Sequence, residues 1–174
     1  MGCGGDDPFA VPLGGSGATS LHGYTGQIGH QVLDRLVHDG QPVRVIARDP
    51  ARLNPRIRER IEVVQGSHSD PEVLAAAFAG ADSLWWLVPP NPRAADIHDH
   101  YLDFTRPAAE AIKTRGVTRV VGVTSLGRAY GKPAGLLSPA FAMDEMIEGT
   151  GVSYRAPTSF RQWCLEVLKP AVMT

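Results

Sequence analysis

The chain has 174 residues, of which 43% are hydrophobic and 20% are charged, and its formal net charge is −1. This length and composition predict a single globular domain with one core. The near-neutral charge, without a dense lysine or arginine tract, argues against nucleic acid as a partner. The longest apolar run, LWWLVPP, is too short to cross a bilayer, so we expect no membrane span.

The start of the chain differs in composition from its middle. Residues 1–17 are rich in glycine, proline and aspartate, which predicts a flexible leader before a domain at 18–156. This leader has neither the basic nor the apolar region of a secretory signal. Two isolated cysteines, Cys3 and Cys164, predict no disulfide framework and no zinc cage, and without an export signal they favour the reduced form. We therefore expect a cytoplasmic protein.

Short apolar runs mark the expected strands. The first must come from SGATSLH, which offers one large aliphatic side chain and should be weakly held. The others are expected at 42–47, 61–66, 82–88, 118–125 and, shorter, 152–156. Several of these runs are near-continuously apolar, as in strands that are buried on both faces. Trp85 and Trp86 should point to opposite faces of their strand.

Helical patterns with recognisable ends lie between these runs. They are expected at about 26–38, 69–80, 94–116 and 138–151. Each stops at a glycine, and Ser69 or Asp70 caps the second helix, with Pro71 at its first position. Pro107 should bend or split the longest helix. The alternation of strands and helices predicts an α/β, doubly wound parallel sheet.

The stretch HGYTGQIG, residues 22–29, precedes the first expected helix. Its glycines, Gly23, Gly26 and Gly29, permit a tight turn and a close approach of backbone to a pyrophosphate. The helix N-terminus behind them would attract the phosphates. Because the chain has 19 glycines, the spacing alone fits an ordinary loop equally well. The position at the start of a βαβ unit favours a phosphate loop.

Arg48 stands at the end of the second strand of that unit, where a dinucleotide-binding domain reads the adenosine ribose. An acidic side chain there binds the ribose hydroxyls of NAD, whereas an arginine pairs with the 2′-phosphate of NADP. We therefore expect NADP(H) to be favoured over NAD(H). The alternative for Arg48 is a solvated charge at a strand end. The adjacent Asp49 suits the capping of a short turn.

With the glycine loop, Arg48 and the segments VVQGSHSDPEVLAAAFAGAD, LWWLVPP and AIKTRGVTRVVGVTSLG, the chain resembles the NmrA-like atypical short-chain dehydrogenase/reductases from about Gly23 to Arg155. The resemblance implies a Rossmann domain that binds NAD(P)H, in a family of regulators and of quinone or azo-type reductases. The family also has a smaller C-terminal substrate lobe. Here the pattern is lost after Arg155, so we expect a divergent tail at 157–174 and no such lobe.

The resemblance also implies a dinucleotide site at the carboxyl ends of the strands, where the fold independently predicts a ligand crevice. Ser67 replaces the aspartate that the family commonly has beside the adenine. Pro89 and Pro90 fall on the loop that passes the nicotinamide. The cofactor-binding residues implied are Gly23, Tyr24, Thr25, Gly26, Gln27, Ile28, Arg48, Ser67, Val88, Pro89, Pro90, Thr124 and Ser125.

Catalytic and metal-binding residues are harder to assign. The chain has no Tyr-x-x-x-Lys pair of the kind that classical members of the superfamily use. Ser125 and Tyr130 remain as catalytic candidates, although Tyr130 also fits an ordinary loop tyrosine. In DIHDHY, only Asp96 and His100 are spaced to face each other on a helix, and two ligands are too few for a closed metal site. We predict a solvated helix face and no metal.

These features predict an NADP(H)-binding oxidoreductase. If it is catalytic, hydride would pass from the nicotinamide to a quinone-like acceptor held near Pro89, Pro90 and Ser125, with side chains orienting the acceptor rather than supplying a strong acid. The alternative is a non-catalytic NADP-binding redox sensor that acts through a protein partner. The missing tyrosine–lysine pair favours this alternative.

Overall fold

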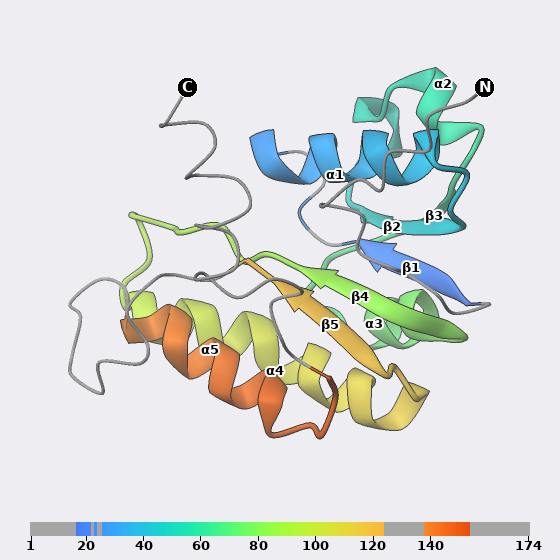
Figure 1. Cartoon of the computed structure of the whole chain (residues 1–174). Helices are drawn as coiled ribbons and strands as arrows, with labels where there is room; N and C mark the ends of the chain where they lie inside the picture. Colours follow the sequence, from blue (N-terminus) through green and yellow to red (C-terminus); the bar gives the residue numbers. More distant parts are fainter. Residues whose placement is uncertain (1–16, 22, 24–25, 124–137, 154–174) are drawn as a thin grey trace, which may run out of the picture. The chain divides into compact units, whose positions relative to one another are not determined.

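The computed structural model describes residues 17–21, 23, 26–123 and 138–153, which lie within one compact unit, Gly15–Tyr154. Its strands pair in parallel in the order β3-β2-β1-β4-β5 (Figure 1). They are β1 (Ala18–Leu21), β2 (Val43–Ala47), β3 (Glu62–Gln65), β4 (Ala81–Trp86) and β5 (Arg119–Gly122). The doubly wound α/β sheet is confirmed, and its strand order reverses between β1 and β4.

Helices cover both faces of this sheet (Figure 1). One face carries α1 (Gln27–His38), η1 (Pro50–Arg52) and α2 (Pro55–Arg58), and the other carries α3 (Pro71–Phe78), α4 (Ile97–Arg115) and α5 (Ser138–Glu148). The side chains of β4 divide between the two resulting cores: Trp86 packs with α3, α4 and α5, and Trp85 packs on the side of α1. The prediction for the two tryptophans is confirmed.

β1 does come from the weakly apolar segment, and it lies at the centre of the sheet. Ser20 and Leu21 are fully buried, and β1 pairs on one side with β2 and on the other with β4. Backbone hydrogen bonds in a ladder do not depend on side-chain type, so two strongly apolar neighbours hold a strand that has little apolar surface of its own.

The predicted helix ends are largely confirmed. The Asp70 carboxylate accepts a hydrogen bond from the Glu72 N–H at the start of α3, and Asp49 caps η1 by accepting from the Ala51 N–H. Gly80 and Gly116, with φ of +67° and +74°, follow the ends of α3 and α4. Such left-handed residues are typical helix stops.

Two expectations are met only in part or not at all in the form of a break or a full strand. Pro107 does not split α4, which runs unbroken from Ile97 to Arg115. The proline removes a single hydrogen bond, and the buried packing of α4 against α3 and α5 outweighs that loss. The expected strand at 152–156 is reduced to one bridge between Ser153 and Arg119, and residues 154–156 lie outside the described part of the chain. None of the described helices is both long and apolar enough to cross a membrane.

Candidate functional site

The loops after β1 and β4 meet at the point where the strand order reverses, which is where open α/β sheets hold their ligands. Gly23, after β1, has φ +80°, a conformation that residues with a side chain rarely adopt. A Cβ at this position would also lie 3.3 Å from the Leu87 carbonyl oxygen, after β4. Conformation and close approach therefore both require glycine here.

The N-terminus of α1 follows this turn and lacks any acidic or capping side chain. Its N-cap is Gly26, no side chain bonds to the cap, and the first turn holds no Asp or Glu. The first N–H groups of a helix have no partner within the helix and attract anions. Beside them, the Ile28 side chain is 49% exposed, the one large hydrophobic side chain so exposed in the described part of the chain.

Arg48 directly follows β2 at the same edge of the sheet. Its side chain is exposed and forms no hydrogen bond or ion pair with any residue in the described ranges. The neighbouring Asp49 carboxylate is occupied as the cap of η1, at 3.1 Å from the Ala51 N–H. The guanidinium is therefore the group at this strand end that remains available to a phosphate.

The loop after β3 lies next to Arg48. The Gly66 N–H donates to the Ala47 carbonyl at 3.1 Å, which ties this loop to the end of β2. Ser67 bonds through its hydroxyl to the Ser69 hydroxyl at 2.9 Å. The His68 imidazole is half-buried, and burial together with the positive charge of Arg48 lowers the pKa of His68 to about 4. At neutral pH this ring is uncharged.

The first turns of α4 connect this loop to the loop after β4. The Phe104 ring lies between two imidazoles, with centroid distances of 6.5 Å to His68 and 5.7 Å to His100. His100 Nε2 lies 3.0 Å from the Pro89 carbonyl oxygen, a hydrogen bond that requires the proton on Nε2. Pro89 and Pro90 are exposed, whereas the Val88 side chain is buried in the core.

The predicted cofactor-binding and catalytic residues divide into two groups. Those described lie on the loops and the helix start at the carboxyl edge of the sheet: Gly23, Gly26, Gln27, Ile28, Arg48, Ser67, Val88, Pro89 and Pro90. Tyr24, Thr25, Thr124, Ser125 and Tyr130 lie outside the described residues. The binding and catalytic roles of both groups stay predictions.

Three residues of this edge were missed by the sequence patterns: Leu87, His68 and His100. The spacing of His100 and Phe104 places them on one helix face, a signal that was available. No local pattern brings His68 to Phe104, because their contact joins two distant segments. Tyr101, next to His100, is buried, and burial raises the pKa of its phenol. It is thus a weaker acid than an ordinary tyrosine.

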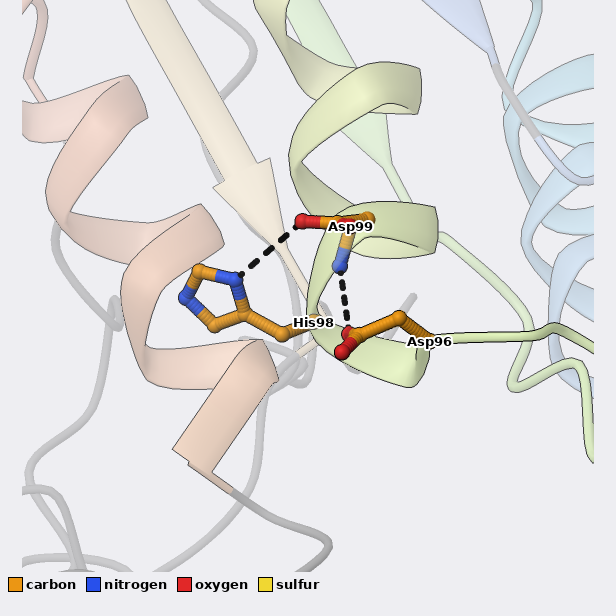
Figure 2. Close-up of side chains that lie close together, drawn as sticks. All are labelled: Asp96, His98 and Asp99. Atoms are coloured by element: carbon orange, nitrogen blue, oxygen red, sulfur yellow. Dashed lines mark hydrogen bonds and ion pairs between the residues drawn. The ribbon is translucent and has the colours of Figure 1, made fainter.

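In the DIHDHY segment, Asp96 is the N-cap of α4, and His98 and Asp99 are exposed in the first turn that follows (Figure 2). The expectation that only Asp96 and His100 are spaced to face each other is wrong: Asp96 accepts from the Asp99 N–H at 3.0 Å, and the adjacent His98 and Asp99 approach to 3.8 Å. Donor atoms of Asp96, His98 and Asp99 lie within 4.8 Å of one another, and all three residues are exposed. Helix capping accounts for the Asp96 contact.

Comparison with known proteins places the chain in a family. Residues 23–170 match the model of a family described as NAD(P)H-binding. The chain is 27% identical over 137 residues to quinone oxidoreductase 2 of Escherichia coli, covering 78% of this chain and 46% of that protein. It is 42% identical over 74 residues to (4-alkanoyl-5-oxo-2,5-dihydrofuran-3-yl)methyl phosphate reductase of Streptomyces griseus, covering 42% of this chain and 25% of that protein. The chain spans less than half the length of these curated relatives.

Solved structures share the fold. The NADP(H) complex of triphenylmethane reductase from Citrobacter sp. matches with a TM-score of 0.64 at 21% identity, covering 79% of this chain and 47% of that one. The NADPH complex of the quinone oxidoreductase from E. coli matches with a TM-score of 0.61 at 24% identity, covering 78% and 46% of the two chains. The Rossmann fold expected from the sequence is confirmed. By this fold and by the match over residues 23–170, the chain belongs to the NAD(P)H-binding family.

Proposed function

We propose that the chain binds NADP(H) in preference to NAD(H), with the pyrophosphate at the N-terminus of α1 and the adenosine 2′-phosphate at Arg48. The observation that carries this proposal is the exposed Arg48 side chain, which pairs with no described residue and lies at a strand end beside the glycine loop. An arginine pairs with a phosphate through two parallel hydrogen bonds, which a ribose hydroxyl does not offer.

The surroundings of Arg48 support the same preference. In NAD-binding domains a carboxylate at this place accepts hydrogen bonds from the ribose hydroxyls. The nearest carboxylate in sequence here is Asp49, and it caps η1 instead. The first turn of α1 adds no negative charge. An anion entering this edge therefore meets the positive end of a helix and an arginine, whereas the adjacent Asp49 carboxylate accepts a hydrogen bond within η1.

We propose further that the bound nucleotide reduces a quinone-like acceptor. When bound, NADPH supplies a hydride, and the chain supplies binding and orientation. Ile28, Pro89 and Pro90 expose apolar surface beside the switch point, which suits a flat conjugated ring. Relatives that bear on this acceptor class are quinone oxidoreductase 2 of E. coli and the NAD(P)H azoreductase of Xenophilus azovorans, the latter 27% identical over 111 residues. The predicted acceptor residue Ser125 lies outside the described residues.

Calorimetric titration of the purified chain with NADPH and with NADH tests the binding proposal. We expect NADPH to bind at least tenfold more tightly than NADH. A dissociation constant above about 1 mM for both, a free energy weaker than about −4 kcal/mol, would refute dinucleotide binding. Equal affinities would refute the NADP preference alone.

Oxidation of NADPH in the presence of a panel of quinones, followed by its absorbance, tests the acceptor. We expect turnover with at least one quinone and its loss when the glycine loop is disrupted by Gly26→Asp. Turnover that survives Gly26→Asp would belong to another site or to a contaminant. Tight NADPH binding without turnover on any quinone would refute the reductase proposal and leave the binding proposal intact.

A further inference from the structure

The corner formed by the loops after β2 and β3 holds a titratable group that the proposed function does not use. His68 lies two residues after Gly66. The Gly66 N–H donates to the carbonyl of Ala47, the last residue of β2, and Arg48 directly follows Ala47. The His68 ring also packs against Phe104 of α4. These contacts place the imidazole in the same corner as Arg48, to which we assign the 2′-phosphate, and the Arg48 charge acts on the ring.

We propose that His68 is a second specificity-determining residue of this site, which takes up a proton when NADP(H) binds and then faces the 2′-phosphate together with Arg48. This inference rests on the proposed function, because it requires NADP(H) at Arg48. It assigns a chemical role to the residue that follows Ser67, the position at which the chain departs from the family pattern.

The electrostatics of the corner give the direction of the effect. Without a ligand, burial and the Arg48 charge lower the pKa of His68 from 6.5 to about 4. A phosphate dianion at Arg48 neutralises the nearby positive charge and attracts an imidazolium, so both changes raise the pKa of His68. A group whose pKa rises on binding takes up a proton, and affinity then increases as the pH falls. NAD(H) lacks this phosphate and should show no such increase.

Other titratable groups near His68 do not reproduce this pattern. The His100 ring also packs against Phe104, and its Nε2 forms a hydrogen bond with the Pro89 carbonyl oxygen. Asp70, two residues after His68, is engaged as the cap of α3. Among the groups of the described loops and of α4, His68 is the one that combines partial burial with a position beside Arg48.

The test is calorimetric titration with NADPH at pH values from 7 to 5, each in two buffers of different ionisation enthalpy, which counts the protons taken up. The 2′-phosphate itself titrates with a pKa of about 6, in the opposite sense. That contribution is common to all variants, so the difference between wild type and His68→Gln isolates the imidazole. His38→Gln, an exposed histidine of α1, is the matched control.

Near pH 5.5, we expect wild type and His38→Gln to take up more protons on binding NADPH than His68→Gln does. As the pH falls, their affinity for NADPH should increase relative to that of His68→Gln by up to about tenfold per pH unit. NADH should show no difference between the variants. Equal proton uptake in wild type and His68→Gln, with NADPH binding intact, would overturn the role of His68. A His68-dependent uptake on NADH would overturn the link to the 2′-phosphate.

A second measurement does not depend on the folding of a variant. The wild-type His68 imidazole can be titrated by NMR with and without the oxidised nucleotide, with His68→Gln or His68→Asn used to assign its signal. We expect its pKa to rise when NADP⁺ is added and to stay unchanged with NAD⁺. An unchanged pKa with saturating NADP⁺ would overturn the inference alone. Failure of both nucleotides to bind would overturn the proposed function as well.

Discussion

The two edges of the sheet treat their polar groups in opposite ways, and β2 carries one arginine toward each. At the amino edge, Arg44 donates to the Ala77 and Ala79 carbonyls at 2.9 and 2.7 Å and forms an ion pair with Glu62 at 2.7 Å. Its side chain is only 14% exposed. At the carboxyl edge, Arg48 is exposed and has no partner among the described residues.

The difference shows what each arginine does for the molecule. Arg44 supplies positive charge and donors to the C-terminal carbonyls of α3 and pairs with Glu62, so its side chain is used within the fold. The carboxyl edge instead gathers an arginine, an open helix N-terminus and an uncharged histidine, none of which is needed to close the sheet. Because Arg48 is exposed and has no partner among the described residues, altering it is expected to affect binding rather than stability.

The largest effect should come from the turn at the carboxyl edge. Gly23→Val forces a β-branched side chain into φ +80° and against Leu87. We expect both NADPH and NADH to bind at least about 100-fold more weakly, roughly 3 kcal/mol, by calorimetry. Gly40→Val is the control, because Gly40 has a similar φ of +69° with nothing within 4 Å of an added Cβ. If both variants bound NADPH equally, the close approach at Gly23 would be irrelevant to binding.

Arg44→Met should be the more damaging of the two arginine changes to the fold itself. It removes the donors from the end of α3 and leaves Glu62 without its partner. We expect a loss of about 2–3 kcal/mol in the free energy of unfolding, measured with urea. Arg48→Met, on the same strand, should change stability by less than about 0.5 kcal/mol. Similar losses for both would contradict the contrast between the edges.

Arg48→Ala should affect nucleotide binding rather than the stability of the fold. We expect about 10- to 30-fold weaker NADPH binding, about 1.4–2 kcal/mol, because one charge-assisted contact to the 2′-phosphate is lost. NADH affinity should stay within about twofold, since the nucleotide offers no phosphate at that position. Calorimetry of both nucleotides on the same preparation measures the difference. Equal losses would assign Arg48 to a general role in the loop.

The sequence predicted what depends on short-range signals. The cap at Asp70, the stop at Gly80 and the strand that ends before Arg48 each follow from residues within a few positions of one another. The same reasoning placed Arg48 at the carboxyl edge, because an alternating parallel sheet collects its strand ends there. The central strand from Ala18 to Leu21 was found by its position before the loop rather than by its own apolar content.

The remainder depends on contacts between distant segments. Nothing near Arg44 in sequence shows that the end of α3 will meet it, and nothing near His68 points to Phe104. Pro107 does not split α4, because the tertiary packing of that helix outweighs one lost hydrogen bond. Local patterns therefore indicated the candidate site, whereas the uncharged state of His68 in its corner could be inferred only from the fold.

The smallest expected effect is the loss of free energy of unfolding that the buried His68 causes at low pH. His68 has a folded-state pKa of about 4 against 6.5 unfolded, so the unfolded chain binds more protons between these values and stability falls as the pH falls. For this half-buried ring we expect the free energy of unfolding to fall by about 1–2 kcal/mol between pH 7 and pH 5.

Urea denaturation at both pH values should show this loss in wild type and in His98→Gln, which replaces an exposed histidine, but not in His68→Gln. Saturating NADP⁺ should reduce it in wild type, because a phosphate beside the ring favours its charged form. A loss of equal size in wild type and His68→Gln would place the cost of acid elsewhere in the molecule and remove the electrostatic basis for coupling this corner to the nucleotide.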